Sequence, residues 1–320
     1  MARRCTVLDD YQGVALSTAD WSGLAGDVEV TVLREHIADP DELVAALADS
    51  EIVVSMRERT PFPAELFAAL PKLELLVTTA MRNASIDLAA AAEHGVTVCG
   101  TGYIGTPTVE LTWALILGLA RNVAVENAGF HAGDGRWQTT VGADLAGATL
   151  GLLGLGRLGT GVAKVAQAFG MNVTAWSQNL TAERAAEAGV ALAPSKLDLI
   201  AGADIVSIHL VLSRRTRHLV DAEALAALKP TAYLVNTSRA GIVDTAALVA
   251  ALRAGSFAGA GLDVYDTEPL PAGDELRTLP NVLGTPHLGY VTRNTYRIFY
   301  RDIVEDIAAF LAGSPIRQLG

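Results

Sequence analysis

A glycine-rich turn near the middle of the chain constrains its fold more than any other feature. Residues 154–159 read G-L-G-R-L-G, which is the pattern G-x-G-x-x-G. The apolar run 148–153 predicts a strand before this turn, and the residues 158–169 and 172–176 predict an amphipathic helix and a second strand after it. Such glycines permit a tight turn, close approach of the backbone to a pyrophosphate, and close packing of helix on strand. The turn therefore predicts a dinucleotide-binding βαβ unit.

The rest of the chain alternates between apolar strand-like runs and helical segments. In the first third we expect strands at 51–55, 73–78 and 96–99, with helices at 63–70 and ending near 89–94. After the glycine-rich unit we expect strands at 205–210, 232–236, 260–264 and 281–284, and a helix at 245–253 capped by Asp244. Strands this continuously apolar suit a parallel sheet covered on both faces. The predicted fold class is α/β, with doubly wound parallel sheets.

The spacing of these elements indicates two α/β units rather than one. One unit lies near residues 1–100 and the other near 105–285, with a long helical segment at about 107–130 leading into the second. A final helix at about 293–311 follows the second unit. A length of 320 residues agrees with about two domains.

Composition excludes several classes of protein. The formal net charge of −11 argues against a nucleic-acid partner, because such surfaces need a positive field, and 51% hydrophobic residues exclude disorder. No apolar run reaches about 18 residues, so we expect no membrane span and, without an apolar stretch behind the N-terminal arginines, no signal peptide. Cys5 and Cys99 are far apart and lack metal-ligand spacing. Free thiols in a reducing cytoplasm are therefore expected.

Three of the expected strands lead into polar residues that could take part in catalysis. The strand at 232–236 leads to Arg239, the strand at 260–264 leads to Glu268, and the strand at 281–284 ends just before His287. Ligands of open α/β sheets bind outside the carboxyl ends of the strands, so we expect these side chains to converge on one crevice.

These residue types fit the reduction of a ketone by hydride. The resulting alkoxide needs a proton, which a histidine can donate, and a carboxylate bonded to that histidine orients the ring and favours its protonated form. An arginine can bind a substrate carboxylate with two hydrogen bonds. We therefore predict an oxidoreductase with His287 as acid–base, Glu268 as its partner, Arg239 as substrate anchor, and no metal.

The choice between the two nicotinamide cofactors stays open at this point. A carboxylate at the end of the second strand would bind the adenosine ribose, and a nearby arginine would bind a 2′-phosphate. Ser177, Gln178 and Asn179 stand there, with neither an acid nor an adjacent base, and Arg184 follows a few residues later. The hypothesis is that both NAD and NADP are accepted with modest discrimination.

Several stretches together resemble the D-isomer-specific 2-hydroxyacid dehydrogenase family, in particular its glyoxylate and hydroxypyruvate reductases. The most specific are NTSRAG, DVYDTEPL and TPHLGY, which contain the three polar residues named above. The matching stretches occur in the family's order and cover most of the chain: 84–101, 109–121, 147–159, 203–220, 234–252, 261–270 and 281–290.

The resemblance implies an architecture that the spacing does not show. A Rossmann cofactor domain, residues 102–287, would be inserted into a flavodoxin-like substrate domain made of residues 1–101 plus 288–320. The C-terminal helix would return to that first domain. The resemblance also implies a homodimer joined through the cofactor domains.

The resemblance further implies residue roles. Arg239, Glu268 and His287 match the family's catalytic arginine, glutamate and histidine. The positions that match cofactor contacts are the turn residues Gly154, Gly156, Arg157, Leu158 and Gly159, the ribose-reading Ser177, the adenosine-side Leu210, Val211 and Thr216, and the nicotinamide-side Thr237 and Asp263.

One loop departs from the family pattern. The usual glycine-rich loop that contacts the substrate carboxylate reads Thr79-Ala80-Met81-Arg82-Asn83 here. Its backbone N–H groups could still bind a carboxylate, with Met81 and Arg82 at the substrate, and Arg57 from the preceding loop adds another cation. The hypothesis is a small anionic 2-oxo or 2-hydroxy acid that carries a second negative group.

Two other functions occur on the fold that the resemblance implies. Formate oxidation uses the same fold but replaces the glutamate with glutamine, so Glu268 argues against it. A nucleotide-sensing corepressor would bind partner peptides, and this chain lacks long disordered tails while keeping all three catalytic residues.

Overall fold

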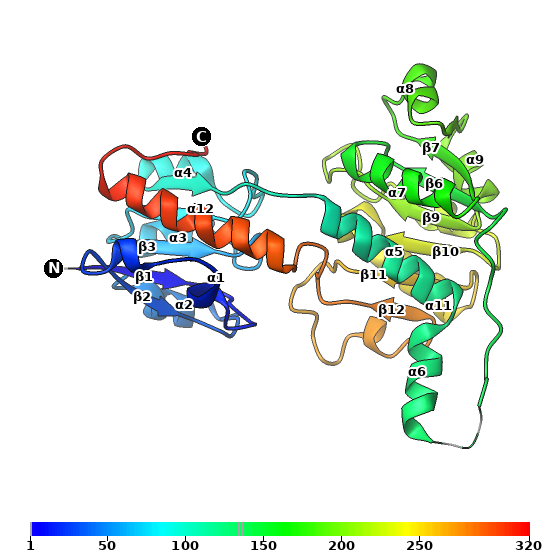
Figure 1. The fold of residues 1–320 in the computed structure, drawn as a ribbon, viewed down its shortest axis with the longest axis horizontal. Helices are drawn as coiled ribbons and strands as arrows, with labels where there is room; N and C mark the ends of the chain where they lie inside the picture. Colours follow the sequence, from blue (N-terminus) through cyan, green and yellow to red (C-terminus); the bar gives the residue numbers. More distant parts are fainter. Residues whose placement is uncertain (1, 134, 136) are drawn as a thin grey trace. The chain divides into compact units, whose positions relative to one another are not determined.

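The chain forms two compact units in the computed structural model, which describes residues 2–133, 135 and 137–320 (Figure 1). Unit 1 consists of Met1–Ile104 and Thr292–Gly320, and unit 2 of Gly105–Val291. The chain therefore leaves unit 1, builds all of unit 2, and returns to unit 1 with its last helix.

Unit 1 is built on a five-stranded parallel sheet with the order β2-β1-β3-β4-β5. The order reverses between β1 and β3. Its strands are β1 (Arg3–Val7), β2 (Val28–Val32), β3 (Ile52–Ser55), β4 (Leu75–Thr78) and β5 (Thr97–Gly100). Its helices are α1 (Ala15–Thr18), α2 (Pro40–Leu47), α3 (Ala64–Ala69), α4 (Leu88–Glu93) and α12 (Arg293–Leu311), with a 3₁₀ turn at Ser22–Leu24.

Helices cover both faces of this sheet. A buried cluster that includes Leu47, Phe67 and Ala91 joins α2, α3 and α4 to one face. On the other side, α12 contacts α1, β4 and β5, and it buries Phe299, Tyr300 and Ile303. Strands that are buried on both faces explain why β3 and β4 read as continuous apolar runs.

The segment that follows α12 closes the edge of the sheet. The N–H of Gly100 donates to the carbonyl of Arg317 (3.0 Å), and the N–H of Leu319 donates to the carbonyl of Val98 (2.8 Å). Arg317 also donates to the buried carboxylate of Asp306 on α12 (2.9 Å). The end of the chain is thus fastened to both β5 and α12.

Unit 2 contains a seven-stranded parallel sheet with the order β12-β11-β10-β9-β6-β7-β8. The order reverses between β6 and β9. Its strands are β6 (Thr149–Leu153), β7 (Asn172–Trp176), β8 (Ala191–Leu192), β9 (Ile205–Ile208), β10 (Tyr233–Asn236), β11 (Gly259–Leu262) and β12 (Val282–Gly284). Its helices are α5 (Thr106–Ala120), α6 (Val123–Ala132), α7 (Arg157–Ala168), α8 (Ala182–Glu187), α9 (Lys196–Gly202), α10 (Ala222–Ala226) and α11 (Thr245–Arg253), with 3₁₀ turns at Ala240–Ile242 and Glu275–Arg277.

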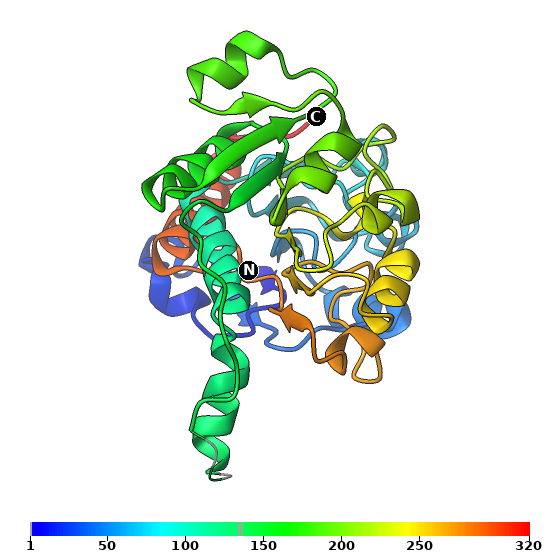
Figure 2. The same ribbon diagram turned by 90° about the vertical axis from the view of Figure 1, so that its right-hand side faces the viewer.

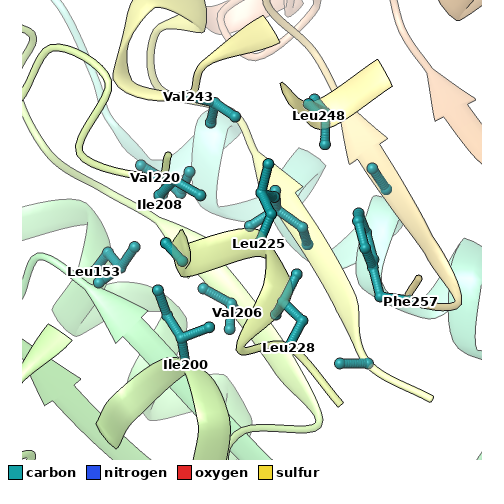
Figure 3. Close-up of a cluster of buried hydrophobic side chains, with 14 of the residues drawn as sticks. Leu153, Ile200, Val206, Ile208, Val220, Leu225, Leu228, Val243, Leu248 and Phe257 are labelled. Carbon is teal, nitrogen blue, oxygen red and sulfur yellow. The ribbon is translucent and has the colours of Figure 1, made fainter. Parts of the chain in front are cut away.

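Two apolar clusters lie on opposite faces of this sheet. Figure 3 shows one of them, in which Ile200 of α9, Leu225 of α10 and Leu248 of α11 meet the strand residues Val206 and Ile208. The other cluster joins α5 and α7 to the opposite face. The sheet is doubly wound, and together with the sheet of unit 1 it confirms the predicted fold class.

The long helical segment expected at about 107–130 is confirmed, but it consists of two helices, α5 and α6. Asn122 adopts a left-handed conformation (φ +52°), which ends α5, and α6 departs at 65° from it. No residue of α6 is buried, and Figures 1 and 2 show it extending away from the sheet of unit 2. A continuous helical pattern did not reveal this break, because asparagine is also tolerated inside helices.

Other expectations from the sequence are confirmed. The expected strands correspond to observed strands within a few residues, α12 spans Arg293–Leu311, and Asp244 caps α11 through the N–H of Ala247. Cys5 and Cys99 are buried free thiols. Over the described part of the chain no single helix is long and apolar enough to cross a membrane; α5 and α6 together meet the length and composition but are sharply bent.

Candidate active site

The glycine-rich turn lies where the strand order of unit 2 reverses. Gly154 has a left-handed φ of +102°, and a Cβ there would lie 2.5 Å from the carbonyl oxygen of His209. A Cβ on Gly159 would lie 2.2 Å from the carbonyl oxygen of Gly154, so the helix can approach the strand only without side chains. A Cβ on Gly156, in contrast, would meet nothing within 4 Å. The turn therefore leaves open space in front of α7.

The N-terminus of α7 faces this turn without a side-chain cap. Gly156 is the N-cap residue, has no side chain to accept from the first N–H groups, and precedes a helix of 12 residues. Uncapped N–H groups and the partial positive charge of a helix N-terminus suit a phosphate. Arg157 and Leu158 begin the helix, as the pattern predicts. These features fit the pyrophosphate of a dinucleotide.

The turn after β7 is contacted by Arg215, a cation that was not predicted from the sequence. Arg215 donates from Nε to Oε1 of Gln178 (2.7 Å) and from Nη2 to Oδ1 of Asn179 (3.3 Å). The turn after β7 therefore has an adjacent base, which corrects the expectation that none is present. Arg215 is 37 residues from Gln178 and arrives on the loop after β9, so local sequence could not reveal the pair.

The loop after β9 is ordered by one of its own residues. Thr216 donates to the carbonyl of Val211 (2.7 Å) and accepts from the N–H of Ser213 (2.8 Å). This leaves Val211 74% exposed, whereas Leu210 is half-buried against the core. At the start of the loop, burial lowers the pKa of His209 to about 4, and its ring pairs with Ser207 (2.9 Å). His209 is therefore neutral near pH 7.

The turn after β10 is shaped by a buried asparagine. Asn236 donates from Nδ2 to the carbonyl of Arg239 (3.0 Å) and accepts from the N–H of Ser238 (3.0 Å). Thr237 is buried, and its hydroxyl pairs with that of Thr112 in α5 (2.8 Å). Arg239 is half-buried, with one guanidinium N–H on the carbonyl of Ser238 (2.8 Å). These bonds fix the start of the Arg239 side chain.

Glu268 and His287 form the contact that the sequence predicts. Oε2 of Glu268 lies 2.6 Å from Nδ1 of His287, and both side chains are mostly covered. The other carboxylate oxygen accepts from the N–H of Tyr265 (2.9 Å), which orients the carboxylate. Because Nδ1 is engaged, the ring is left with Nε2 for proton exchange.

A buried carboxylate secures the segment that carries His287. Asp263 has no exposed surface; its Oδ1 accepts from the Thr285 hydroxyl (2.6 Å) and the Leu288 N–H (2.7 Å), and its Oδ2 accepts from the Gly289 N–H (2.9 Å). Burial raises the pKa of Asp263, and the hydrogen bonds oppose that rise. These three bonds fasten the chain on both sides of His287. The nicotinamide contact expected for Asp263 stays a prediction.

Strand order explains why these groups come from distant parts of the chain. Arg239 follows β10, Glu268 follows β11 and His287 follows β12, and these three strands are neighbours in the sheet. All run parallel, so the three residues leave the same edge of the sheet. The arrangement provides a guanidinium and a carboxylate–imidazole pair, which can bind an anion and move a proton.

Comparison with known proteins identifies the family. The model of the family described as D-isomer specific 2-hydroxyacid dehydrogenase, NAD binding domain, matches residues 113–289. The glyoxylate reductase of Aeropyrum pernix is 40% identical over 239 residues, which cover 72% of this chain and 70% of that protein. The chain belongs to the D-isomer specific 2-hydroxyacid dehydrogenase family.

Other members of this dehydrogenase family agree with that assignment. The D-3-phosphoglycerate dehydrogenase of Methanocaldococcus jannaschii is 37% identical over 230 residues, which cover 72% of this chain but only 44% of that longer protein. The crystal structure of a phosphoglycerate oxidoreductase from Vibrio cholerae O395 superposes with a TM-score of 0.93, at 35% identity, over 98% of this chain and all of that one. The predicted family and the oxidoreductase class with an NAD(P) cofactor are confirmed at this level.

The expected substrate residues of this dehydrogenase lie on two loops of unit 1. Arg57 follows β3 in a left-handed conformation (φ +53°); its side chain is 14% exposed and lies 3.5 Å from Glu58 and 5.8 Å from the centre of the Tyr103 ring. Met81 and Arg82 follow β4 and are exposed. Arg57 is thus held in place, whereas Arg82 extends into solvent.

Among the described residues, no group of three or more His, Cys, Asp or Glu side chains could hold a metal ion.

The sequence did not reveal three features of the site: the contacts of Arg215, the hydrogen bonds of Asp263 to the His287 segment, and the turn shaped by Asn236. The run S-R-R-T-R at 213–217 was a visible signal for the first of these.

Proposed function

We propose that this chain catalyses the reversible reduction of a small 2-oxo acid to a D-2-hydroxy acid with NAD(P)H. The observation that carries the proposal is the Glu268–His287 pair, which leaves the same sheet edge as Arg239 in the unit that contains the glycine-rich turn. The nicotinamide, when bound, supplies or accepts the hydride.

The residues proposed to hold the cofactor follow from the open turn. The N–H groups at the start of α7 would bind the pyrophosphate, and residues that follow β7 and β9 would hold the adenosine. The proposed cofactor contacts are Gly154, Gly156, Arg157, Leu158, Gly159, Ser177, Leu210, Val211, Thr216, Thr237 and Asp263.

The proton and the substrate carboxylate are handled by separate residues. His287 donates a proton from Nε2 during reduction and takes it back during oxidation, because Glu268 occupies Nδ1. Glu268 stabilises the protonated ring and fixes its orientation. Arg239 binds the substrate carboxylate with its planar guanidinium.

We propose that unit 2 is the cofactor domain and unit 1 the substrate domain. Arg57, Met81 and Arg82 on the loops of unit 1 would contact the substrate, and the two arginines favour a second anionic group on it. Two relatives are named for glyoxylate and for D-3-phosphoglycerate, respectively, which supports testing substrates both with and without such a group.

A homodimer joined through unit 2 is proposed from an exposed apolar arm. The arm consists of α6 and residues 137–141, and Glu126 of α6 accepts from the N–H groups of Thr139 (3.1 Å) and Thr140 (2.6 Å). Large apolar side chains on the arm lie in solvent, including Phe130 (66% exposed), Trp137 (78%) and Val141 (96%). A second copy would cover them.

The buried free thiols favour a reducing, cytoplasmic location.

A substrate panel followed at the nicotinamide absorbance tests the function. Glyoxylate, pyruvate, hydroxypyruvate and oxaloacetate are compared by kcat/KM with NADH and NADPH, and D-3-phosphoglycerate is tested for oxidation. We expect turnover of small 2-oxo acids to D products. The absence of turnover throughout the panel would contradict the function, and a preference for bulky aromatic 2-oxo acids would contradict the anionic second group.

A further inference from the structure

The loop after β9 carries an unusual concentration of positive charge. Residues 213–218 read S-R-R-T-R-H, with three arginines and no acid, in a chain of net charge −11. The turn after β7 at 177–180 also contains no acid. Hydrogen bonds from Arg215 to Gln178 and Asn179 hold these two segments together. A local positive site therefore lies at the end of the second strand of the glycine-rich βαβ unit.

The contacts of Arg215 leave its charge uncompensated. Its hydrogen-bond partners in the described part of the chain, Gln178 and Asn179, are both neutral amides. An amide oxygen carries no net charge, so these hydrogen bonds orient the guanidinium but do not offset its charge, whereas a dianionic phosphate would do both. The amides thus hold the exposed guanidinium in position without neutralising it.

Position in the fold indicates what this charge would bind. In a dinucleotide-binding βαβ unit, the residue after the second strand meets the adenosine ribose, where a carboxylate would bind the hydroxyls and repel a 2′-phosphate. Ser177 stands at that position and brings a hydroxyl instead of a carboxylate. A phosphate on the ribose would meet Ser177 and the guanidinium of Arg215 together.

We propose that Arg215 binds the 2′-phosphate of NADP(H), held in place by Gln178 and Asn179, so that the enzyme prefers NADP(H) to NAD(H). This inference rests on the proposed function, because it places a dinucleotide along the turn 154–159. It replaces the modest discrimination expected from the sequence with a definite preference.

Calorimetric titration with two half-cofactors tests the phosphate contact without turnover. Adenosine 2′,5′-bisphosphate carries the extra phosphate, and 5′-AMP lacks it. We expect wild-type protein to bind the bisphosphate at least about 10-fold more tightly, and Arg215→Ala to lower this ratio by about 10- to 100-fold. Ser177→Asp should reverse the preference, because a carboxylate would bind the ribose hydroxyls and repel the phosphate.

Two further arginines serve as comparisons. Arg253→Ala removes the same charge from an exposed position at the end of α11, where the arginine pairs with Glu275, and it should leave the ratio unchanged. Arg184→Ala tests the other arginine near the turn. If Arg184→Ala lowers the ratio and Arg215→Ala does not, the assignment to Arg215 is overturned.

The same titrations separate this inference from the proposed function. Equal affinity of wild-type protein for both half-cofactors would overturn the 2′-phosphate contact, even if 2-oxo acids are turned over with NADH. Binding of neither half-cofactor would overturn the dinucleotide site and the inference together. A preference for NADPH over NADH in steady-state kcat/KM, reduced in Arg215→Ala, is the expected result in turnover.

Discussion

His287 is held in a backbone conformation that it would not adopt alone. Its φ of +55° lies in the left-handed region, which disfavours residues other than glycine by about 1 kcal/mol or more. The hydrogen bonds from Leu288 and Gly289 to Asp263 stabilise this conformation, while Glu268 holds the ring. Backbone and side chain are thus fixed by two different carboxylates.

Replacing His287 tests its proposed role as the proton donor. His287→Ala should lower kcat by at least about 100-fold, the usual contribution of a general acid, while NAD(P)H still binds. Single-turnover kinetics and cofactor titration measure the two effects separately. Near-normal turnover in this variant would remove His287 from the mechanism.

Replacing Asp263 tests whether its buried carboxylate holds the segment that carries His287. In Asp263→Asn one oxygen becomes an NH₂ group that cannot accept from the backbone, so the His287 segment should loosen and kcat should fall about 10-fold or more. Thr285→Val should act in the same direction, and Thr285→Ser, which keeps the hydroxyl, should restore activity. These variants are compared by kcat, KM and direct NAD(P)H binding. A loss of cofactor affinity that matches the loss of kcat would show that Asp263 acts through its proposed cofactor contact and not through the His287 segment.

Among single residues, the sequence predicts the site residues that directly follow the ends of parallel strands. Glu268 and His287 were expected together because parallel strands end at one edge of a sheet, and they are in contact. The partners of Arg215 and Asp263 depend on loops that are folded back by tertiary contacts, so position along the chain did not reveal them.

Among the elements, α12 combines a packing role with a titratable one. Its Asp306 is fully buried, and burial raises the pKa of this carboxyl to about 7, although Arg317 opposes the rise. The folded protein therefore holds the proton more tightly than the unfolded chain does. The resulting stabilisation is complete below about pH 4 and is lost as the pH rises through 7.

Asp306→Asn removes this titration and should change the pH dependence of stability. Between pH 4.5 and 8.5 the wild-type protein should lose unfolding free energy relative to the variant, by at most about 4 kcal/mol. Urea unfolding of both proteins at several pH values measures the difference. Parallel stability curves for the two proteins would show that Asp306 does not titrate in this range.

Element types were more predictable than element ends. Apolar runs located the buried strands, and capping by Asp244 located the start of α11. The break at Asn122 was not predictable, because one left-handed residue redirects a helix without altering its apolar pattern. The strands β1, β2 and β8 are not predicted from the sequence; β2 and β8 lie at sheet edges and carry exposed residues, which interrupt the apolar pattern.

For the whole molecule, the exposed arm on unit 2 makes the clearest prediction. Phe130→Asp places a charge among the apolar side chains that a second copy would bury, so the dimer should dissociate to monomers. Leu192→Asp is the matched control, because Leu192 on β8 is also exposed (39%) but lies away from the arm. Light scattering after size-exclusion chromatography measures the mass. A wild-type monomer, or a Phe130→Asp dimer, would contradict the proposed surface.

The net charge of the whole chain predicts its ligands only in part. The net charge of −11 describes the surface as a whole, yet the residues proposed to bind anions, Arg57, Arg82, Arg215 and Arg239, are cations on loops after strands. Local loops therefore determine which ligand is attracted, and the total charge does not.

The division of unit 1 by unit 2 has a consequence for synthesis on the ribosome. The five strands of unit 1 emerge first, but α12, which covers β4 and β5, follows only after all of Gly105–Val291 has been made. At typical bacterial and eukaryotic rates this interval lasts roughly 10–40 s. During it one face of the nascent sheet lacks its cover, and by its end unit 2 has every residue of its own core. The inserted unit can therefore complete its folding before the unit that begins the chain, and a chaperone would find its binding site on β4 and β5.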